Sequence, residues 1–592
     1  MRMRGTGLIA ALCAAARTVA VSLPPSIGVR DAAHDGQIAK PVIDLGDAGL
    51  YRGIIQNNGT VASWKGIPYA KPPVGSLRFM PPEPLGEQST NIVDTSEDAL
   101  RCVQFSGASY GIINSNIVGV KAGPGQEDCL KLWIWKPVNA TAESKLPVMF
   151  YVHGGGLQYS AAPNNDFSDW VGQSQDFIAV NVGYRLGALG FMGHTSLPSA
   201  NAGILDQRLA LKWLSQHVAA FGGDPDNVTI MGQSGGGYGI VSQMALYDGD
   251  SEGLFQQAIP RSIQRAPMFK IEELEDRNAE FARLLNCTSG QDQLDCFRNA
   301  TVQSLVDAYA SITKFEASSG MFSNLTFGSS AAFLPMIDNV TLTDTITRLF
   351  QNGRIANVSL IAGAVNDEGA NAVPRNITSL NPATNQIWNL TASQVEEVAG
   401  RYPVNETFGF ASPDSFFLSE FKAYIQSLHP FGEAGITGSE RVVGLYMAQA
   451  FGANRVWNFR FNSPTVGTNY SNPNLPLNYV THSADNSYLQ NSTAVMKPFE
   501  KAIAHEWRAY LGSFIRTGNP NNQKLASSPV WHNYGFLGDP EASPMRLVPQ
   551  FNFLSNLASG ELTGTQMEVA QRAQIQREDW WTTDGILEAT RL

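Results

Sequence analysis

Val-Thr-Ile-Met-Gly-Gln-Ser-Gly-Gly-Gly, at residues 228–237, joins a β-rich run to an apolar helical pattern through the motif G-x-S-x-G. This motif places a serine on a sharp turn between a strand and a helix. The turn strains the backbone, so the residues two before and two after Ser234 have to be very small, and Gly232 and Gly236 meet that demand. The N-terminus of the helix points at the serine and stabilises negative charge there. The stretch therefore predicts an exposed nucleophilic serine in an α/β fold.

A second glycine-rich stretch, His153-Gly154-Gly155-Gly156, comes directly after an apolar run at residues 148–152. Consecutive glycines let bare backbone N–H groups converge on one point, as the oxyanion of a tetrahedral intermediate requires. A phosphate-binding loop is the alternative, but no Gly-Lys-Ser/Thr follows. The stretch predicts an oxyanion hole.

A nucleophilic serine needs a base and an acid, which follow it in this fold in the order acid, then base. His482, in Tyr-Val-Thr-His-Ser-Ala-Asp at residues 479–485, follows a predicted strand at 456–461 by a long loop, where the fold places its base. The other histidines lie in the glycine turn, in helical patterns or in regions without a catalytic cue. Asp367 and Glu368 end another predicted strand, and spacing alone leaves both open as the acid.

Short β-rich runs alternate with helical patterns along the chain, which predicts an α/β fold with a mostly parallel sheet. The clearest strands are expected at residues 148–152, 177–182, 228–231, 358–362 and 456–461, and the clearest helices at 204–221, 273–285, 305–312 and 441–450. Residues 239–354 and 395–450 are mostly helical in pattern. We expect them to be insertions that form a cap over a gorge, not separate domains.

Composition limits the classes of partner. The 592 residues carry a formal net charge of −11, which disfavours binding to nucleic acid. Hydrophobic residues make up 43% of the chain, enough for a large core, while charged residues reach only 16%. Uncharged polar residues and glycans are therefore expected to cover much of the surface.

The N-terminus has the pattern of a secretory signal peptide. Arg2 and Arg4 precede a short apolar run at residues 8–16, and small residues follow. We expect residues 1–20 to be the signal and residues 21–592 to be a single domain of a secreted, extracellular protein. No stretch reaches the 18 or more apolar residues of a membrane span.

Asparagine sequons and cysteines agree with secretion. Of 13 Asn-x-Ser/Thr sequons, Asn227 lies beside a predicted core strand and is not expected to be used. The other candidates are Asn58, Asn139, Asn286, Asn299, Asn324, Asn339, Asn357, Asn376, Asn389, Asn405, Asn469 and Asn491. Cys13 lies in the signal and leaves four cysteines, for which three pairings exist; local pairing closes the shortest loops. No CxxC-type spacing indicates zinc.

Several further motifs, in the order in which they follow along the chain, make the sequence resemble the type-B carboxylesterase/lipase family of α/β-hydrolases, which includes cholinesterases and secreted fungal lipases. They are Gly-Ile-Pro-Tyr-Ala at 66–70, Leu-Arg-Phe at 77–79, Glu-Asp-Cys-Leu at 127–130, Tyr-Arg-Leu-Gly at 184–187 and Phe-Gly-Gly-Asp-Pro at 221–225. The resemblance covers nearly the whole chain after the signal.

The resemblance implies a role for individual residues. Ser234 matches the nucleophile, His482 the base and Glu368, not Asp367, the acid. Further matches are the oxyanion donors Gly155, Gly156 and Gly235, the disulfides Cys102–Cys129 and Cys287–Cys296, and a structural ion pair of Arg78 with Glu127. The family usually has Glu, Ala, Phe and Gly where this chain has Gln233, Gly235, Leu157 and Ile263. These departures affect the pocket and remove no catalytic group.

The expected function is secreted serine ester hydrolysis through an acyl-enzyme, with no cofactor or metal. A triacylglycerol lipase in transient contact with a lipid interface is the alternative, and a catalytically inactive binding or adhesion protein is the alternative class. The expected substrates are neutral acyl esters. The segment from Cys102 to Cys129 has no Trp to hold a quaternary ammonium group, and Gln233 is uncharged. That segment carries instead the apolar residues Ile112, Ile113, Ile117, Val118 and Val120.

Overall fold

A computed structural model describes residues 40–105, 125–287, 293–319, 333–371, 390–403, 422–467, 480–539, 541, 545–549 and 565–590. The expected signal, residues 1–20, lies outside these ranges. In the part of the chain so described, no helix is both long and apolar enough to cross a membrane.

Eleven strands of the described chain form one sheet in the order β14-β13-β12-β11-β10-β9-β7-β8-β6-β4-β3. The strands are β3 (Ile54–Gln56), β4 (Val61–Pro68), β6 (Lys131–Pro137), β7 (Leu146–Val152), β8 (Ile178–Val182), β9 (Gly223–Gln233), β10 (Gln257–Arg261), β11 (Ser359–Val365), β12 (Val456–Phe461), β13 (Met545–Val548) and β14 (Gln566–Val569). In this order, every pair of neighbouring strands between β8 and β13 is parallel. The outer pairs are antiparallel. A small separate sheet joins β1 (Val42–Asp44), β2 (Leu50–Arg52) and β5 (Ile92–Asp94).

The central strands are buried on both faces, because alternate residues of each strand enter different cores. Phe150 of β7 packs in one core and its neighbour Tyr151 in the other. The first core contains residues of α3 (Ala202–His217), α4 (Gly235–Ala245) and α13 (Gly438–Phe451). The second contains residues of α1 (Ser168–Ser174), α14 (Asn486–Gln490) and α15 (Pro498–Thr517). The result is a sheet between two helical layers, as expected for an α/β fold.

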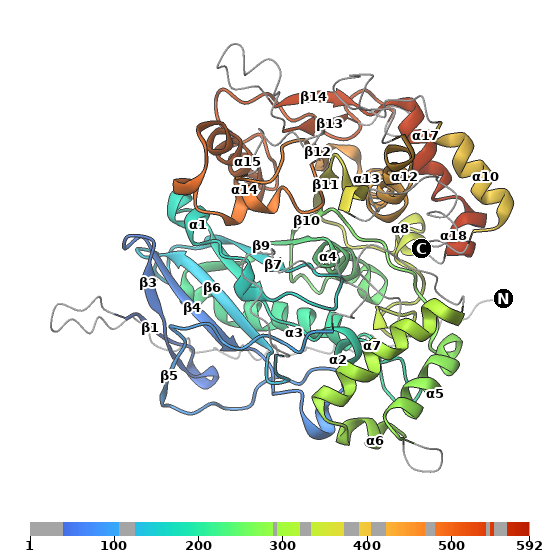
Figure 1. The fold of residues 1–592 in the computed structure, drawn as a ribbon. Helices are drawn as coiled ribbons and strands as arrows, with labels where there is room; N and C mark the ends of the chain where they lie inside the picture. Colours follow the sequence, from blue (N-terminus) through green and yellow to red (C-terminus); the bar gives the residue numbers. More distant parts are fainter. Residues whose placement is uncertain are drawn as a thin grey trace, which may run out of the picture.

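Helical insertions follow β10 and β11, as the sequence pattern indicated. The first contains α5 (Glu275–Leu284), α6 (Gln293–Asn299), α7 (Val302–Ser319) and α8 (Ile346–Gln351), and the second contains α10 (Ala392–Arg401), α12 (Lys422–Gly432) and α13. Figure 1 shows α5, α6 and α7 grouped at the lower right, and α10 beside the C-terminal helices α17 (Arg572–Trp580) and α18 (Asp584–Thr590) at the upper right. The short helix α2 (Gly187–Gly190) packs against α3.

The predicted strands and helices all fall on observed elements, with one omission inside the first helical stretch. Residues 257–261 form β10, which pairs in parallel with β9 and β11 in the middle of the sheet. The described part of residues 239–354 is mostly helical, as predicted, but the sequence pattern did not indicate this strand. Pro260 makes this strand hard to predict from the sequence. Proline cannot donate a backbone hydrogen bond to a neighbouring strand and is rare in central strands.

Candidate active site

The turn between β9 and α4 carries Ser234. The residue has φ 61° and ψ −125°, a strained conformation for a side-chain-bearing residue. A Cβ on Gly232 would lie 2.4 Å from the carbonyl oxygen of Gly236, and a Cβ on Gly236 would lie 2.1 Å from that of Val152. Both positions therefore require glycine, as the sequence motif predicted. The serine was also expected to be exposed, but Ser234 is buried, because the glycine turn after β7 packs against it.

The structure brings Ser234, His482 and Glu368 into one hydrogen-bonded chain. Nε2 of His482 lies 2.8 Å from Oγ of Ser234, and Nδ1 lies 2.5 Å from Oε2 of Glu368. The Glu368 carboxylate is fully buried, and its Oε1 accepts the N–H of Val365 at 2.9 Å. Each residue follows the carboxyl end of a strand or lies in a loop at that edge: Ser234 after β9, Glu368 after β11 and His482 before α14.

The two neighbouring carboxylates have different surroundings. Asp367 accepts the N–H of Val480 at 2.8 Å and the side-chain amide of Asn366 at 2.8 Å, and it does not bind the imidazole. It therefore holds the backbone just before His482, while Glu368 holds the ring. Burial raises the pKa of Asp367 to about 6.

The pKa of His482 is the result of opposing effects. Burial lowers it, but the negative charge and hydrogen bond of Glu368 outweigh burial and hold the pKa above its ordinary value of 6.5, with a smaller contribution from Asp485. An imidazole held in this way accepts a proton readily, which suits a general base.

The glycine turn after β7 lies against the serine. An added Cβ on Gly235 would lie 2.8 Å from the backbone nitrogens of Gly156 and Leu157, so these groups converge beside the start of α4. Gly155 and Gly156 have φ of 100° and 61°, a left-handed conformation that favours glycine. Among the described residues, no group accepts a hydrogen bond from the N–H of Gly155, Gly156 or Gly235. The three predicted donors are thus available to a ligand.

The departures from the family pattern lie close to this centre. Gly235 stands where alanine is usual, and the close approach of Gly156 and Leu157 explains why a methyl group is absent. Leu157 is buried and has φ 60°. Gln233, in place of the usual glutamate, has its amide Nε2 3.3 Å from Nε2 of His482.

A set of buried polar residues behind His482 was not predicted from the sequence. Arg261 at the end of β10 forms an ion pair with Asp485, and both side chains are fully buried. Asn486 joins this pair to Gln233. Arg261 lies in the strand that was missed. Asp485 and Asn486 follow the predicted base by only a few residues but belong to no motif of their own.

The remaining histidines near the site are structural. The ring of His153 stacks on Tyr184 with 4.5 Å between centroids, and burial lowers its pKa to about 4. His429 is also buried, and burial lowers its pKa to about 3. It lines a cavity of about 110 Å³ together with Glu368.

Cys102–Cys129 and Cys287–Cys296 are disulfide bonded. Arg78 and Glu127 form a two-pronged ion pair at 2.6 Å for each bond, and Arg78 also donates to the carbonyl of Ala300 at 2.6 Å. This ion pair joins the N-terminal region to the end of α6. We therefore assign it a structural role.

Some predicted residues lie outside the described chain. They are Ile112, Ile113, Ile117, Val118 and Val120 of the first disulfide loop, and the sequons Asn324, Asn376, Asn389, Asn405 and Asn469. The described candidate sequons are exposed at Asn58, Asn139, Asn286, Asn299, Asn339, Asn357 and Asn491. The amide of Asn227, by contrast, donates to the carbonyl of Arg516.

Comparison with known proteins identifies the family of the chain. A sequence profile described as "Carboxylesterase family" matches residues 39–548. The chain belongs to the carboxylesterase family. It has the α/β-hydrolase fold and is an ester hydrolase. The crystal structure of Aspergillus niger EstA superposes with a TM-score of 0.76 at 26% identity, covering 93% of this chain and 99% of that one.

Two relatives of this carboxylesterase chain have informative names. "Secreted lipase 1" of Botryotinia fuckeliana is 29% identical over 87% of this chain and 91% of its own. "Acetylcholinesterase" of Electrophorus electricus is 31% identical over 53% of this chain and 49% of its own. The relatives thus include one named a lipase and one named a cholinesterase, and the substrate has to be argued from this chain's own residues.

Proposed function

We propose that this chain is a secreted serine carboxylic-ester hydrolase that acts on neutral acyl esters through Ser234, His482 and Glu368. The observation that carries the proposal is the continuous chain of hydrogen bonds from Oγ of Ser234 through His482 to the buried Glu368. The N–H groups of the glycine turn beside it, for which the described part of the chain offers no acceptor, add the second requirement of acyl transfer, a site for the oxyanion.

Acylation follows from the geometry. Oγ of Ser234 attacks the ester carbonyl carbon while Nε2 of His482 takes the hydroxyl proton. Glu368 accepts the Nδ1–H and stabilises the imidazolium that forms. The carbonyl oxygen becomes an oxyanion and binds the N–H groups of Gly155, Gly156 and Gly235. The C–O bond to the alcohol then breaks, and His482 returns its proton to the departing alkoxide oxygen.

Deacylation repeats these steps with water. His482 takes a proton from the water as its oxygen attacks the acyl carbon, and the same N–H groups bind the second oxyanion. The bond to Oγ breaks, His482 protonates Ser234, and the carboxylic acid leaves. All proton transfers use the same imidazole, which explains why its tautomer has to be fixed by Glu368.

The preference for neutral esters rests on missing cation-binding groups. Gln233 is uncharged where the family usually has a carboxylate, and residues 102–129 contain no Trp. A desolvated cation–π contact contributes roughly 2 kcal/mol, or about 30-fold in affinity. We therefore expect kcat/KM for butyrylcholine to be below that of an uncharged butyrate ester with a similar leaving-group pKa. A tenfold or greater preference for butyrylcholine contradicts this part of the proposal.

A triacylglycerol lipase is the second candidate, because a relative that matches 87% of the chain is named a secreted lipase. Hydrolysis of tributyrin across its solubility limit separates the two. A lipase shows a jump in rate when droplets form, whereas an esterase saturates below the limit.

Secretion is supported by the signal-like residues 1–20, by the two disulfides and by the name of that relative. The proposal predicts recovery of the protein from the culture medium of a secreting host, with a new N-terminus near residue 21. It also predicts a loss of mass on removal of N-glycans, since seven candidate sequons are exposed in the described chain.

A fluorophosphonate label tests the catalytic proposal directly. The active protein should be labelled at Ser234, and Ser234→Ala should lose the label and lower kcat by about 10⁴–10⁶. Ser242→Ala is a matched control, because Ser242 is a buried serine of α4 that only donates to the carbonyl of Tyr238. An unlabelled protein without ester hydrolysis supports a binding protein instead.

A further inference from the structure

The side chain of Gln233 is held in one orientation by a relay that begins at Arg261. Nη2 of Arg261 lies 2.7 Å from Oδ1 of Asn486, Nδ2 of Asn486 lies 3.1 Å from Oε1 of Gln233, and Nε2 of Gln233 lies 3.3 Å from Nε2 of His482. A guanidinium group only donates hydrogen bonds. Asn486 must therefore turn its oxygen to Arg261 and its NH₂ to Gln233. Gln233 in turn must present its NH₂, and not its oxygen, to the imidazole.

The fold holds Arg261, the first residue of the relay, in place. Arg261 is fully buried, pairs with Asp485 and accepts the N–H of Ser234 with its own carbonyl at 3.0 Å. The same residue thus contacts both the turn of the nucleophile and the segment that follows the base. Because a guanidinium group has N–H donors and no acceptor, its role as donor does not change during the reaction.

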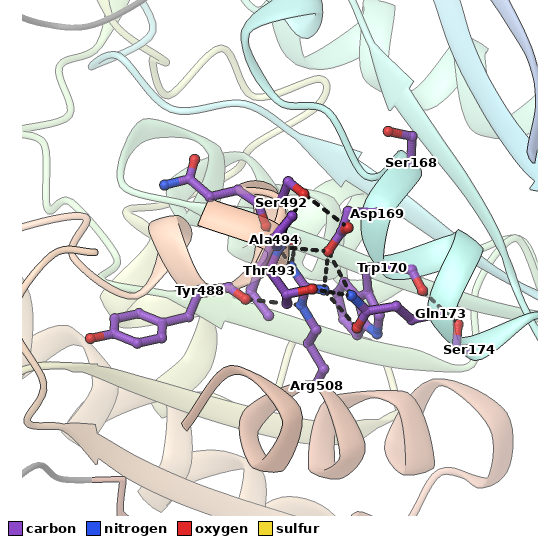
Figure 2. A network of polar contacts seen from close by, with 12 residues as sticks. Ser168, Asp169, Trp170, Gln173, Ser174, Tyr488, Ser492, Thr493, Ala494 and Arg508 are labelled. Atoms are coloured by element: carbon purple, nitrogen blue, oxygen red, sulfur yellow. Dashed lines mark hydrogen bonds and ion pairs between the residues drawn. The ribbon is translucent and has the colours of Figure 1, made fainter. Parts of the chain in front are cut away.

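The position of Asn486 is fixed from the other side by Arg508 of α15. Figure 2 shows Arg508 between α1 and the end of α14. It binds Asp169 of α1 at 2.7 Å and the carbonyl oxygens of Tyr488 and Leu489, which end the short helix α14. These bonds satisfy carbonyl groups that a helix C-terminus leaves free. Asn486 is the first residue of α14, and Arg508 therefore holds in place the helix that carries it.

The orientation of Gln233 distinguishes between the two protonation states of His482. The neutral ring donates Nδ1–H to Glu368 and offers a lone pair at Nε2, which an amide N–H can share with the Ser234 hydroxyl. The protonated ring carries N–H at Nε2 and opposes the amide N–H. The relay thus favours the neutral ring, whereas the usual glutamate at this position favours the protonated one.

Charged groups from the surrounding elements also influence the protonation of His482. Glu368 and Asp367 follow β11, Asp485 precedes α14, and Arg261 ends β10. Farther away, Glu440 of α13 acts on Glu368 and Asp485, and Arg460 of β12 acts on Asp367. The carboxylates that act on His482 itself, Glu368 and Asp485, both favour its protonated form.

We infer that Gln233, oriented by Asn486 and Arg261, is a positioning residue that keeps His482 unprotonated at lower pH than the facing carboxylates alone allow. This inference rests on the proposed function of His482 as the base. The consequence is that ester hydrolysis extends further into the acidic range than it does with glutamate at position 233.

The acid limb of the pH profile of kcat/KM tests the relay. Gln233→Met removes the donor and should raise the midpoint of that limb by about half a unit to one unit, and Gln233→Glu should raise it by about one to two units. Gln490→Met is the matched control, because Gln490 lies on the same helix as Asn486 but binds Asn165. Its acid limb should match that of the unchanged protein.

A double mutant shows whether Asn486 acts through Gln233. Asn486→Leu should move the acid limb upward, and Gln233→Met/Asn486→Leu should move it no further than Gln233→Met alone. If the leucine variant does not fold, Asn486→Asp replaces it. An aspartate still accepts a hydrogen bond from Arg261 but has no N–H to donate to Gln233. An acid limb that stays in place or falls in Gln233→Met, or shifts that add in the double mutant, overturns the inference. Fluorophosphonate labelling of Ser234 in the same samples shows separately whether the proposed nucleophile is correct.

Discussion

Replacing Glu368 by glutamine probes the most specific feature of the site, the selection of one imidazole tautomer. Oε1 of Glu368 accepts the N–H of Val365, so a glutamine placed there keeps its oxygen on that bond. Its NH₂ then faces Nδ1 of His482, 2.5 Å away in the present structure. The ring must accept at Nδ1 and carry its proton at Nε2, where it can no longer take the proton of Ser234.

The expected loss is large because the wrong tautomer and the missing charge act together. We expect kcat/KM of Glu368→Gln to fall by about 10⁴, equivalent to about 5 kcal/mol of transition-state stabilisation. The fold should persist, since glutamine has the same shape and keeps the bond to Val365. The measurement is hydrolysis of p-nitrophenyl butyrate per active site, with thermal unfolding to confirm folding.

Asp367→Asn is the matched control for this experiment. Asp367 accepts two hydrogen bonds, from Val480 and Asn366, and an asparagine loses one of them. This should cost about 1–3 kcal/mol of stability but leave kcat/KM per folded molecule within a few-fold. The reasoning is refuted if Asp367→Asn loses activity by orders of magnitude while Glu368→Gln remains active.

Three further predictions follow from the same geometry. The pKa of His482 is held above 6.5, and only the neutral ring accepts a proton, so kcat/KM should fall as the pH is lowered through a midpoint above 6.5; a midpoint well below that value contradicts the balance of burial against Glu368. Gly235→Ala should lower kcat by about 10- to 100-fold, because its Cβ would lie 2.8 Å from the backbone nitrogens of Gly156 and Leu157 and displace an oxyanion donor; an unchanged kcat with retained fold shows that the turn adapts. The secreted protein should have no free thiol under denaturing conditions, and peptide mapping without reduction should link Cys102 to Cys129 and Cys287 to Cys296, so that any cross-link between the two pairs contradicts the pairing.

The strained turn at Ser234 and the glycine turn were predictable because their geometry depends on adjacent residues. A serine with φ 61° needs glycine two residues to either side, and this requirement is visible in any short window of sequence. Helices were similarly predictable where the helical period was long, as in α3, and strands where β-rich apolar residues followed one another, as in β12. Local backbone sterics and regular burial patterns account for these successes.

The strand β10 and its last residue Arg261 were not predictable in the same way. The strand is five residues long and contains Pro260, so its pattern resembles a break in a helical region. Its place between β9 and β11 depends on pairing with strands that are distant in sequence. The ion pair of Arg261 with Asp485, 224 residues away, has no counterpart in any local motif.

The sequence by itself determined the strained serine turn, the glycine turn and the order of Ser234, the two adjacent carboxylates and His482 along the chain, since each depends on neighbouring residues or on chain order. Spacing left Asp367 and Glu368 equal, and the family resemblance alone favoured Glu368. Only the tertiary structure decided between their environments: the loop that carries His482 and Val480 arrives from more than 100 residues away, places the imidazole on Glu368 and gives Asp367 the backbone N–H instead. Two adjacent carboxylates point in different directions from a strand end, and which of them meets the ring depends on long-range packing that no local window of sequence contains.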